Sequence, residues 1–224
     1  MEAIVYENKD ICKKCGGKCC KKCGCDYSIE NFDNLKIDNL QKILEQGDIS
    51  IVSYQKFQYV RGRLINEPFL YLRARNKNRP IVDLLSLKTT CASLTENGCK
   101  FSLEERPKGG VNLIPGENGT RCYHVKDAMS IIEGWRNHQK TLINLIKRLT
   151  GKSVYKKLEE DIYNLMIDVF EENFEGVSPL EIEDIRGLMP LLYEAYPEIH
   201  EKALLDMYKK QNPLLVKKLT PNKR

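Results

Sequence analysis

The 224-residue sequence is poor in histidine and has no long apolar run. It has three histidines, of which only His124 lies near a cysteine, so histidine alone does not supply a metal site. No stretch approaches the roughly 18 apolar residues of a membrane-spanning helix. The first residues, MEAIVYENKD, lack the charged-then-apolar pattern of a secretory signal. We therefore expect a cytoplasmic protein.

Motifs of common catalytic sites are absent as well. The sequence contains no GxGxxG after an expected strand, no GxxxxGKS/T phosphate loop, no GxSxG turn and no HExxH zinc motif. These absences argue against the best-marked classes of nucleotide-binding enzyme and hydrolase. The sequence assigns no catalytic residue.

Cysteine, by contrast, is abundant. Six of the nine cysteines fall within residues 12–25, which read CKKCGGKCCKKCGC, and the other three are Cys91, Cys99 and Cys122. In a reducing compartment, dense cysteines are metal ligands or redox groups more often than structural disulfides, and nine thiols cannot all pair. The pattern therefore predicts binding of a metal ion or an iron–sulfur cluster.

The first cysteine group has the spacing of a metal-binding loop. Cys12-x2-Cys15 places two thiolates on one tight loop, and the glycines at 16–17 permit the sharp turn that follows. Cys19 and Cys20 add two more donors after a three-residue gap. Because adjacent side chains usually point apart, one of this pair could serve a second site or be buried as a small apolar residue.

The remaining cysteines form a spare pair and a distant group. Cys23 and Cys25 crowd the first group, and we leave open whether either is a ligand. Cys91 and Cys99 bracket the turn sequence Thr-Glu-Asn-Gly, which should return the second thiol toward the first, and Cys122 follows a glycine-rich loop. The simplest geometry folds this distant group back on the first, so that one or two metal sites join remote segments.

This combination of residues resembles a known family. The segment CKKCGGKCC, the pair Cys91-x7-Cys99, and the Phe101 and Arg106-Pro107 that follow are similar to the YkgJ-type cysteine cluster family. That family is a zinc- or iron-chelating domain with a CxxCxxCC signature, to which flagellin lysine N-methylases are related. The similarity covers residues 12–122. It implies six metal ligands, namely Cys12, Cys15, Cys19, Cys20, Cys91 and Cys99.

The sequence departs from the family pattern at two places. Three residues, instead of two, separate Cys15 from the cysteine pair, and Gly110 stands where the family tends to have a cysteine, three positions after the proline of Arg-Pro. We add Cys122 to the expected ligands as a replacement for that cysteine. Cys23 and Cys25 are further candidate donors.

The donor set suits two kinds of metal centre. All-thiolate ligands hold both zinc ions and iron–sulfur clusters, so the expected cofactor is an iron–sulfur cluster or zinc. We expect a metal-binding protein, with a metal or cluster as its partner and no membrane partner. One alternative, by resemblance, is a lysine N-methyltransferase that uses S-adenosylmethionine and acts on a protein substrate. Another is a redox sensor in which Cys12 and Cys15 form a reversible disulfide.

Basic residues accompany the cysteines. Lysines interleave residues 12–25, and the formal net charge is +5. We expect these lysines to lower thiol pKa values and to offset the charge of a thiolate-bound metal. A solvated surface is the alternative, and the lack of an aromatic stacking motif argues against nucleic acid. Arg73, Arg75 and Arg79 cluster around an expected strand, where we expect a solvated edge and not an anion site.

Periodicity predicts an α+β fold. The first half mixes strand and loop signals: a helix at 38–46, strands at 49–59, 69–75 and 80–87, and loop over 90–121. The second half predicts four helices, at 127–149, 153–174, from 178 onward with an interruption at Pro190, and at 197–212. We expect a cysteine-bearing metal-binding domain with short strands over 1–124, a helical region over 125–212 and a flexible tail over 213–224.

Overall fold

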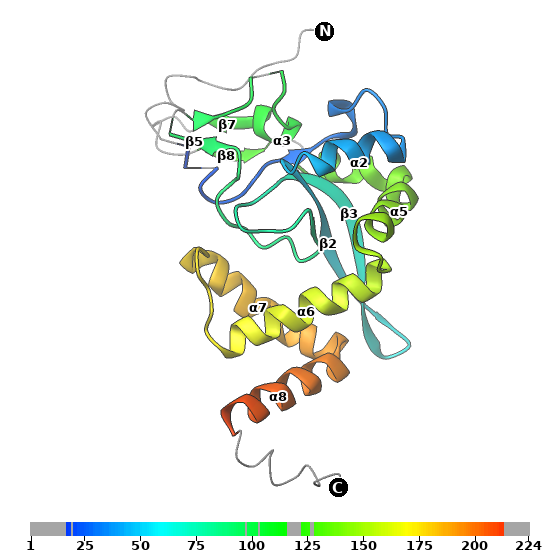
Figure 1. Cartoon of the computed structure of the whole chain (residues 1–224), viewed down its shortest axis with the longest axis vertical. Coiled ribbons are helices and arrows are strands. Elements are labelled where there is room, and N and C mark those ends of the chain that lie inside the picture. The colour runs from blue at the N-terminus through cyan, green and yellow to red at the C-terminus, as the bar shows by residue number, and fades with distance from the viewer. Residues whose placement is uncertain are drawn as a thin grey trace, which may run out of the picture.

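The computed structural model describes residues 17–18, 20–96, 98–102, 104–115, 122–125 and 128–212, without the side chains of residues 114–115, 122–125 and 180. The chain is mixed α/β, with its sheet in the N-terminal half and its long helices in the C-terminal half (Figure 1). The α+β character predicted from periodicity is therefore confirmed.

The N-terminal half carries the strands and three short helices. The strands are β1 (Asp26–Tyr27), β2 (Ile49–Val60), β3 (Arg63–Ala74), β4 (Val82–Asp83), β5 (Leu94–Thr95), β6 (Gly98–Cys99), β7 (Leu113–Pro115) and β8 (Cys122–Val125). The helices are η1 (Ile29–Asn31), a 3-10 turn, α2 (Ile37–Glu45) and α3 (Lys108–Val111). The later helices are α4 (Ala128–Glu133), the 3-10 segment η2 (Gly134–His138), α5 (Gln139–Thr150), α6 (Val154–Phe170), α7 (Pro179–Ala195) and α8 (Pro197–Gln211).

The main sheet has the strand order β1-β3-β2-β4 and is built around one long hairpin. Strands β2 and β3 pair antiparallel along their whole length, from Ile49 opposite Ala74 to Val60 opposite Arg63. The turn at Arg61-Gly62 has φ values of 51° and 77°, both in the left-handed region that two-residue hairpin turns require. Strands β1 and β4 have two residues each. They pair with β3 and β2 at the end of the hairpin away from this turn.

Helices of the C-terminal half cover the sheet and share its core. Leu142 and Ile146 of α5 and Leu158 and Ile162 of α6 are fully buried, in one cluster with the inward side chains of β2 and β3. Burial of each such side chain contributes roughly 1.5–3 kcal/mol to stability, so the apolar faces of α5 and α6 lie against the sheet. Helix α8 packs on α6 and α7 and lies at the opposite end of the long axis from α3, β5, β7 and β8 (Figure 1).

Polar contacts also join the helices to the sheet. Trp135 of η2 is fully buried, and its indole Nε1 donates to the carbonyl of Tyr27 in β1 at 2.8 Å. At the edge of β3, the Gln139 side chain accepts from the Leu70 N–H at 2.9 Å and donates to the Leu70 carbonyl at 2.7 Å. The first turn of α5 is thereby fixed against the middle of the hairpin.

Several expected elements differ in detail. The expected helix over 127–149 is divided into α4, η2 and α5, and the expected strand over 80–87 shrinks to β4. Helix α7 continues through Pro190, because the buried neighbours Met189 and Leu192 hold that turn against the core despite the lost hydrogen bond. In the described part of the chain, no helix is both long and apolar enough to cross a membrane.

Candidate metal centre

The last part of the first cysteine group lies against the end of β3. The Gly24 N–H donates to Oδ1 of Asn76 at 2.7 Å, and the Ala74 N–H donates to the carbonyl of Cys25 at 2.8 Å. A Cβ at position 24 would lie 1.8 Å from the Ala74 carbonyl oxygen, so only glycine allows the two backbones to come this close. The cysteine segment is therefore fixed at its glycine.

Asn76 connects this segment to the second cysteine-bearing segment. Its side chain is buried, and its Nδ2 donates to the carbonyl of Leu87 at 2.8 Å while its Oδ1 accepts from Gly24. Its backbone also forms a β-bridge with Cys91. The Asn76 side-chain amide thus joins the main chain at Gly24 to the main chain at Leu87. No spacing or motif in the sequence predicts this role.

The start of the second cysteine group lies against the first group. The Cys91 N–H donates to the carbonyl of Cys20 at 2.7 Å. Strands β5 and β6 then form a tight hairpin, with Leu94 opposite Cys99 and Thr95 opposite Gly98. The hairpin returns the chain so that Cys99 lies near Cys91, and an ion pair between Lys100 and Asp48 fixes it to the residue before β2.

Two opposing effects act on the Cys91 thiol. Burial raises its pKa, and the backbone N–H of Ser93 opposes part of this rise. The Ser93 hydroxyl is buried and has no hydrogen-bond partner among the described residues. Burial is the larger effect, and it favours the uncharged thiol.

The structure describes the side chains of only some of the expected ligands. Cys91 is buried, and Cys20 and Cys99 are half-buried. Cys122 lies in β8 opposite Pro115, but its side chain is outside the described atoms, as is that of His124 in the same strand. The other three expected ligands lie outside the described residues: Cys12, Cys15 and Cys19. Among the side chains that the structure describes, no three Cys, His, Asp or Glu residues already lie at metal-binding separation.

Cys23 and Cys25 have different surroundings, although both are half-buried. Burial raises the pKa of the Cys23 thiol, and the nearby Arg73 opposes this rise. The pKa of Tyr27 is raised by burial and further by the charges of Cys91, Asp48, Cys99 and Cys25.

The interpretation of the arginines as a solvated strand edge is wrong for Arg73. Its side chain is 11% exposed, and its Nε donates to Oδ1 of Asp26 at 2.7 Å. Its remaining nitrogens donate to the hydroxyls of Tyr71, at 2.8 Å, and Ser86. The guanidinium is therefore fully engaged and joins β1 to β3, directly after the cysteine segment. Sequence reasoning missed this pair because its members lie 47 residues apart.

Arg79 is also paired, through two hydrogen bonds from Nε and Nη2 to the buried carboxylate of Asp83 at 2.9 and 2.7 Å. Such a bidentate pair satisfies the guanidinium geometrically and leaves it unsuited to an anionic ligand. Arg73 and Arg79 are therefore each held by a carboxylate within the fold.

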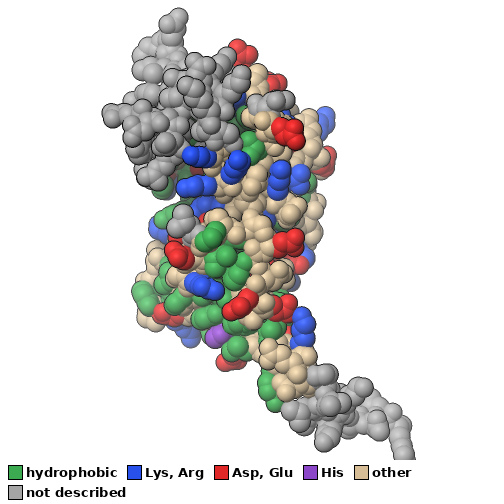
Figure 2. Space-filling model, turned by 90° about the vertical axis from the view of Figure 1, so that its left-hand side faces the viewer, with side chains coloured by type: hydrophobic (Ala, Val, Ile, Leu, Met, Phe, Trp, Pro, Cys, Tyr) green, Lys and Arg blue, Asp and Glu red, His purple; other side chains and the backbone are tan. Residues whose placement is uncertain are grey.

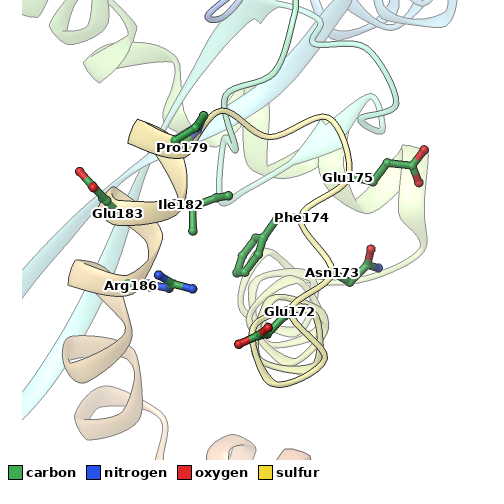
Figure 3. Close-up of a pocket in the computed structure, with 8 residues that line it drawn as sticks. All are labelled: Glu172, Asn173, Phe174, Glu175, Pro179, Ile182, Glu183 and Arg186. Carbon is green, nitrogen blue, oxygen red and sulfur yellow. The ribbon is translucent and has the colours of Figure 1, made fainter.

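A separate surface hollow lies between the end of α6 and the start of α7. Its walls come from the connecting loop and the first turns of α7, with the Phe174 ring directed toward Ile182 and Arg186 (Figure 3). Glu175 and Glu183 point away from its centre in this view. None of its lining residues is a cysteine or histidine, so it is not part of the candidate metal centre.

Comparison of the chain with protein-family models, curated proteins and solved structures finds no match. The donors of the candidate centre are thiols, a chemistry that fits zinc or an iron–sulfur cluster.

Proposed function

We propose that this chain is a cytoplasmic metal-binding protein that holds an iron–sulfur cluster or zinc through its clustered cysteines. The observation that carries the proposal is the main-chain hydrogen bond from Cys91 to Cys20. It brings two cysteine groups 71 positions apart in the sequence into direct contact. A thiolate site that joins remote segments requires that these segments lie together.

The thiols would supply all protein ligands. Cys20, Cys91 and Cys99 are the described members of the proposed set, and Cys12, Cys15, Cys19 and Cys122 complete it. When bound, zinc would act as a structural cross-link, whereas an iron–sulfur cluster would add electron transfer. In either case the Ser93 N–H would donate to the Cys91 thiolate.

The charge around the site supports anionic ligands. Lys18, Lys21 and Lys22 are exposed and lie within the first cysteine group. Lys and Arg side chains gather on the upper part of the described surface, whereas hydrophobic side chains gather lower down (Figure 2). Positive charge close to several thiolates lowers their pKa values and offsets the charge of the site.

The direct test is purification without oxygen, followed by an absorption spectrum and a count of iron, zinc and sulfide per chain. Iron with sulfide and broad visible absorption would identify a cluster, and a colourless protein with zinc would identify a zinc site. A folded protein that retains neither metal, and takes up neither when supplied, would contradict the proposal.

Replacing one ligand of the first group gives a sharper test. We expect Cys15→Ser to lose metal and to melt at a lower temperature, because formation of a thiolate site and folding of the segments around it are coupled. Circular dichroism and elemental analysis of the same sample measure both effects. Full metal content with an unchanged melting temperature would show that Cys15 is not a ligand.

A further inference from the structure

One buried serine lies between two cysteines with its hydroxyl unpaired. Ser93 is 2% exposed, and its hydroxyl has no hydrogen-bond partner among the described residues. Asn66 and Arg75 also hold one buried atom without a partner, but each forms a hydrogen bond through another side-chain atom. Burying an unpaired hydroxyl destabilises a protein, and most buried polar groups are paired. A hydroxyl that is unpaired inside the fold is available to donate to a bound ligand.

We propose that the Ser93 hydroxyl donates a hydrogen bond to a sulfur of the metal-bound centre. This role rests on the proposed function, and it makes Ser93 a positioning residue and not a ligand. A neutral serine hydroxyl is a poor ligand for a metal held by thiolates, whereas it is a good hydrogen-bond donor to them.

The backbone places Ser93 between two expected ligands. The residue follows Cys91 by two positions, inside a turn in which the Leu94 N–H donates to the Cys91 carbonyl at 3.2 Å. The Ser93 carbonyl accepts from the Lys100 N–H at 2.9 Å, and the next residue, Leu94, is paired with Cys99. Ser93 is therefore held by the Cys91 segment on one side and by the Cys99 segment on the other.

The first cysteine group lies against the same place. A Cβ added at Gly17 would lie 2.7 Å from Cδ1 of Leu94, so the Gly17 backbone is packed against the residue that follows Ser93. The carbonyl of Cys20, three residues after Gly17, accepts from the Cys91 N–H. The Ser93 side chain is thus buried where the two cysteine groups meet.

A donor in this position has opposite effects with and without metal. Metal-bound sulfur keeps lone pairs that accept hydrogen bonds, and such bonds orient the ligand and raise metal affinity. In an iron–sulfur cluster they also affect the reduction potential. In the metal-free chain the same hydroxyl is buried without a partner, which costs stability. Removing the hydroxyl should therefore weaken metal binding without weakening the metal-free fold.

Two buried serines form a matched pair for the test. Ser53 is 3% exposed, but its hydroxyl donates to the Leu84 carbonyl at 2.6 Å. We expect Ser53→Ala to lower the melting temperature of the metal-free chain and to leave cobalt(II) affinity unchanged. Ser93→Ala should show the reverse pattern: no fall in the metal-free melting temperature, and cobalt(II) binding weakened by about tenfold.

The experiment measures these quantities on the unaltered chain and on both variants. Each protein is purified without oxygen, its native metal is counted, and the metal-free form is melted by circular dichroism and titrated with cobalt(II). Loss of a donor raises the energy of the sulfur electrons, so the sulfur-to-cobalt charge-transfer band of Ser93→Ala should move to longer wavelength. Ser93→Thr keeps the hydroxyl and should keep the band of the unaltered chain.

The possible results separate this role from a structural one. Unchanged cobalt affinity and band in Ser93→Ala, or the same band shift in Ser93→Thr, would overturn the role of Ser93 alone. A lower metal-free melting temperature with unchanged affinity would make Ser93 a packing residue and would overturn it too. An unaltered chain that holds neither native metal nor cobalt would instead overturn the proposed function, and the role of Ser93 with it.

Discussion

The helical core and the cysteine-bearing end of the molecule are held together by different forces. In the core, Leu142, Ile146, Leu158 and Ile162 are fully buried and pack against the sheet. At the cysteine-bearing end, β5 and β6 have two residues each, and four of the five cysteines whose side chains are described are only half-buried.

The two regions therefore differ in the source of their stability. A buried leucine or isoleucine contributes roughly 1.5–3 kcal/mol, so a few such side chains suffice for the core. The cysteine-bearing end relies on main-chain hydrogen bonds such as those of Gly24 and Cys91, each with a net contribution of about 1 kcal/mol. A region built in this way gains much from a metal cross-link, whereas the core does not need one.

The largest effect is expected from a core cavity. Leu158→Ala should lower the free energy of unfolding by about 3 kcal/mol, because Leu158 is fully buried in α6. The metal bound per folded chain should stay the same. Chemical denaturation and elemental analysis measure the two quantities. Tyr155→Ala is the control on the same helix, since Tyr155 is 61% exposed and its loss should change stability little. A parallel loss of metal in Leu158→Ala would show that the two regions form one cooperative unit.

An intermediate effect is expected where the two regions meet. Arg73→Met should destabilise the protein by about 2–3 kcal/mol, because it leaves Asp26, whose side chain is 19% exposed, without its cation. Arg73→Lys keeps the charge but cannot donate to Asp26, Tyr71 and Ser86 with one planar group, so it should restore only part of the loss. Urea denaturation of both variants tests this order, and equal stability of the lysine variant and the unaltered chain would contradict it.

The smallest effect is expected at a helix end remote from the cysteines. The Ser178 hydroxyl accepts from the Glu181 N–H at the start of α7, so Ser178→Ala should cost about 1 kcal/mol. Metal content should not change. Thermal melting followed by circular dichroism measures the loss, and Ser178→Asp, which keeps an acceptor, should recover most of it. A change in metal affinity in the alanine variant would mean that α7 acts on the cysteine-bearing end.

Local signals in the sequence predict the regular elements well. The short helix α2, the strand β2 and the turn between β5 and β6 all follow from residues within each element. The beginning of β3 was missed because its buried face carries the polar Asn66 beside Leu64, while the apolar Ile65 lies on the exposed face. In α6 the buried stripe begins at Val154, directly after the Ser153 cap, and Tyr155 is exposed.

The candidate site was predictable only in part. The cysteine spacing predicts that two groups meet, and the hydrogen bond between Cys91 and Cys20 agrees with that expectation. The supporting residues could not be predicted, because Asn76 acts through a backbone N–H 52 positions away and Arg73 through a carboxylate 47 positions away. Partners this distant depend on the completed fold and leave no periodic pattern.

The contact between Gln139 and Leu70 has a consequence for the solution behaviour of the protein. Beyond β1, the outer edge of β3 offers backbone N–H and C=O groups with which a second chain could pair. The Gln139 amide binds both the N–H and the C=O of Leu70, so neither group can pair with an added strand. A single glutamine on a helix therefore opposes edge-to-edge aggregation at this hairpin, a hazard that grows with the length of an open strand.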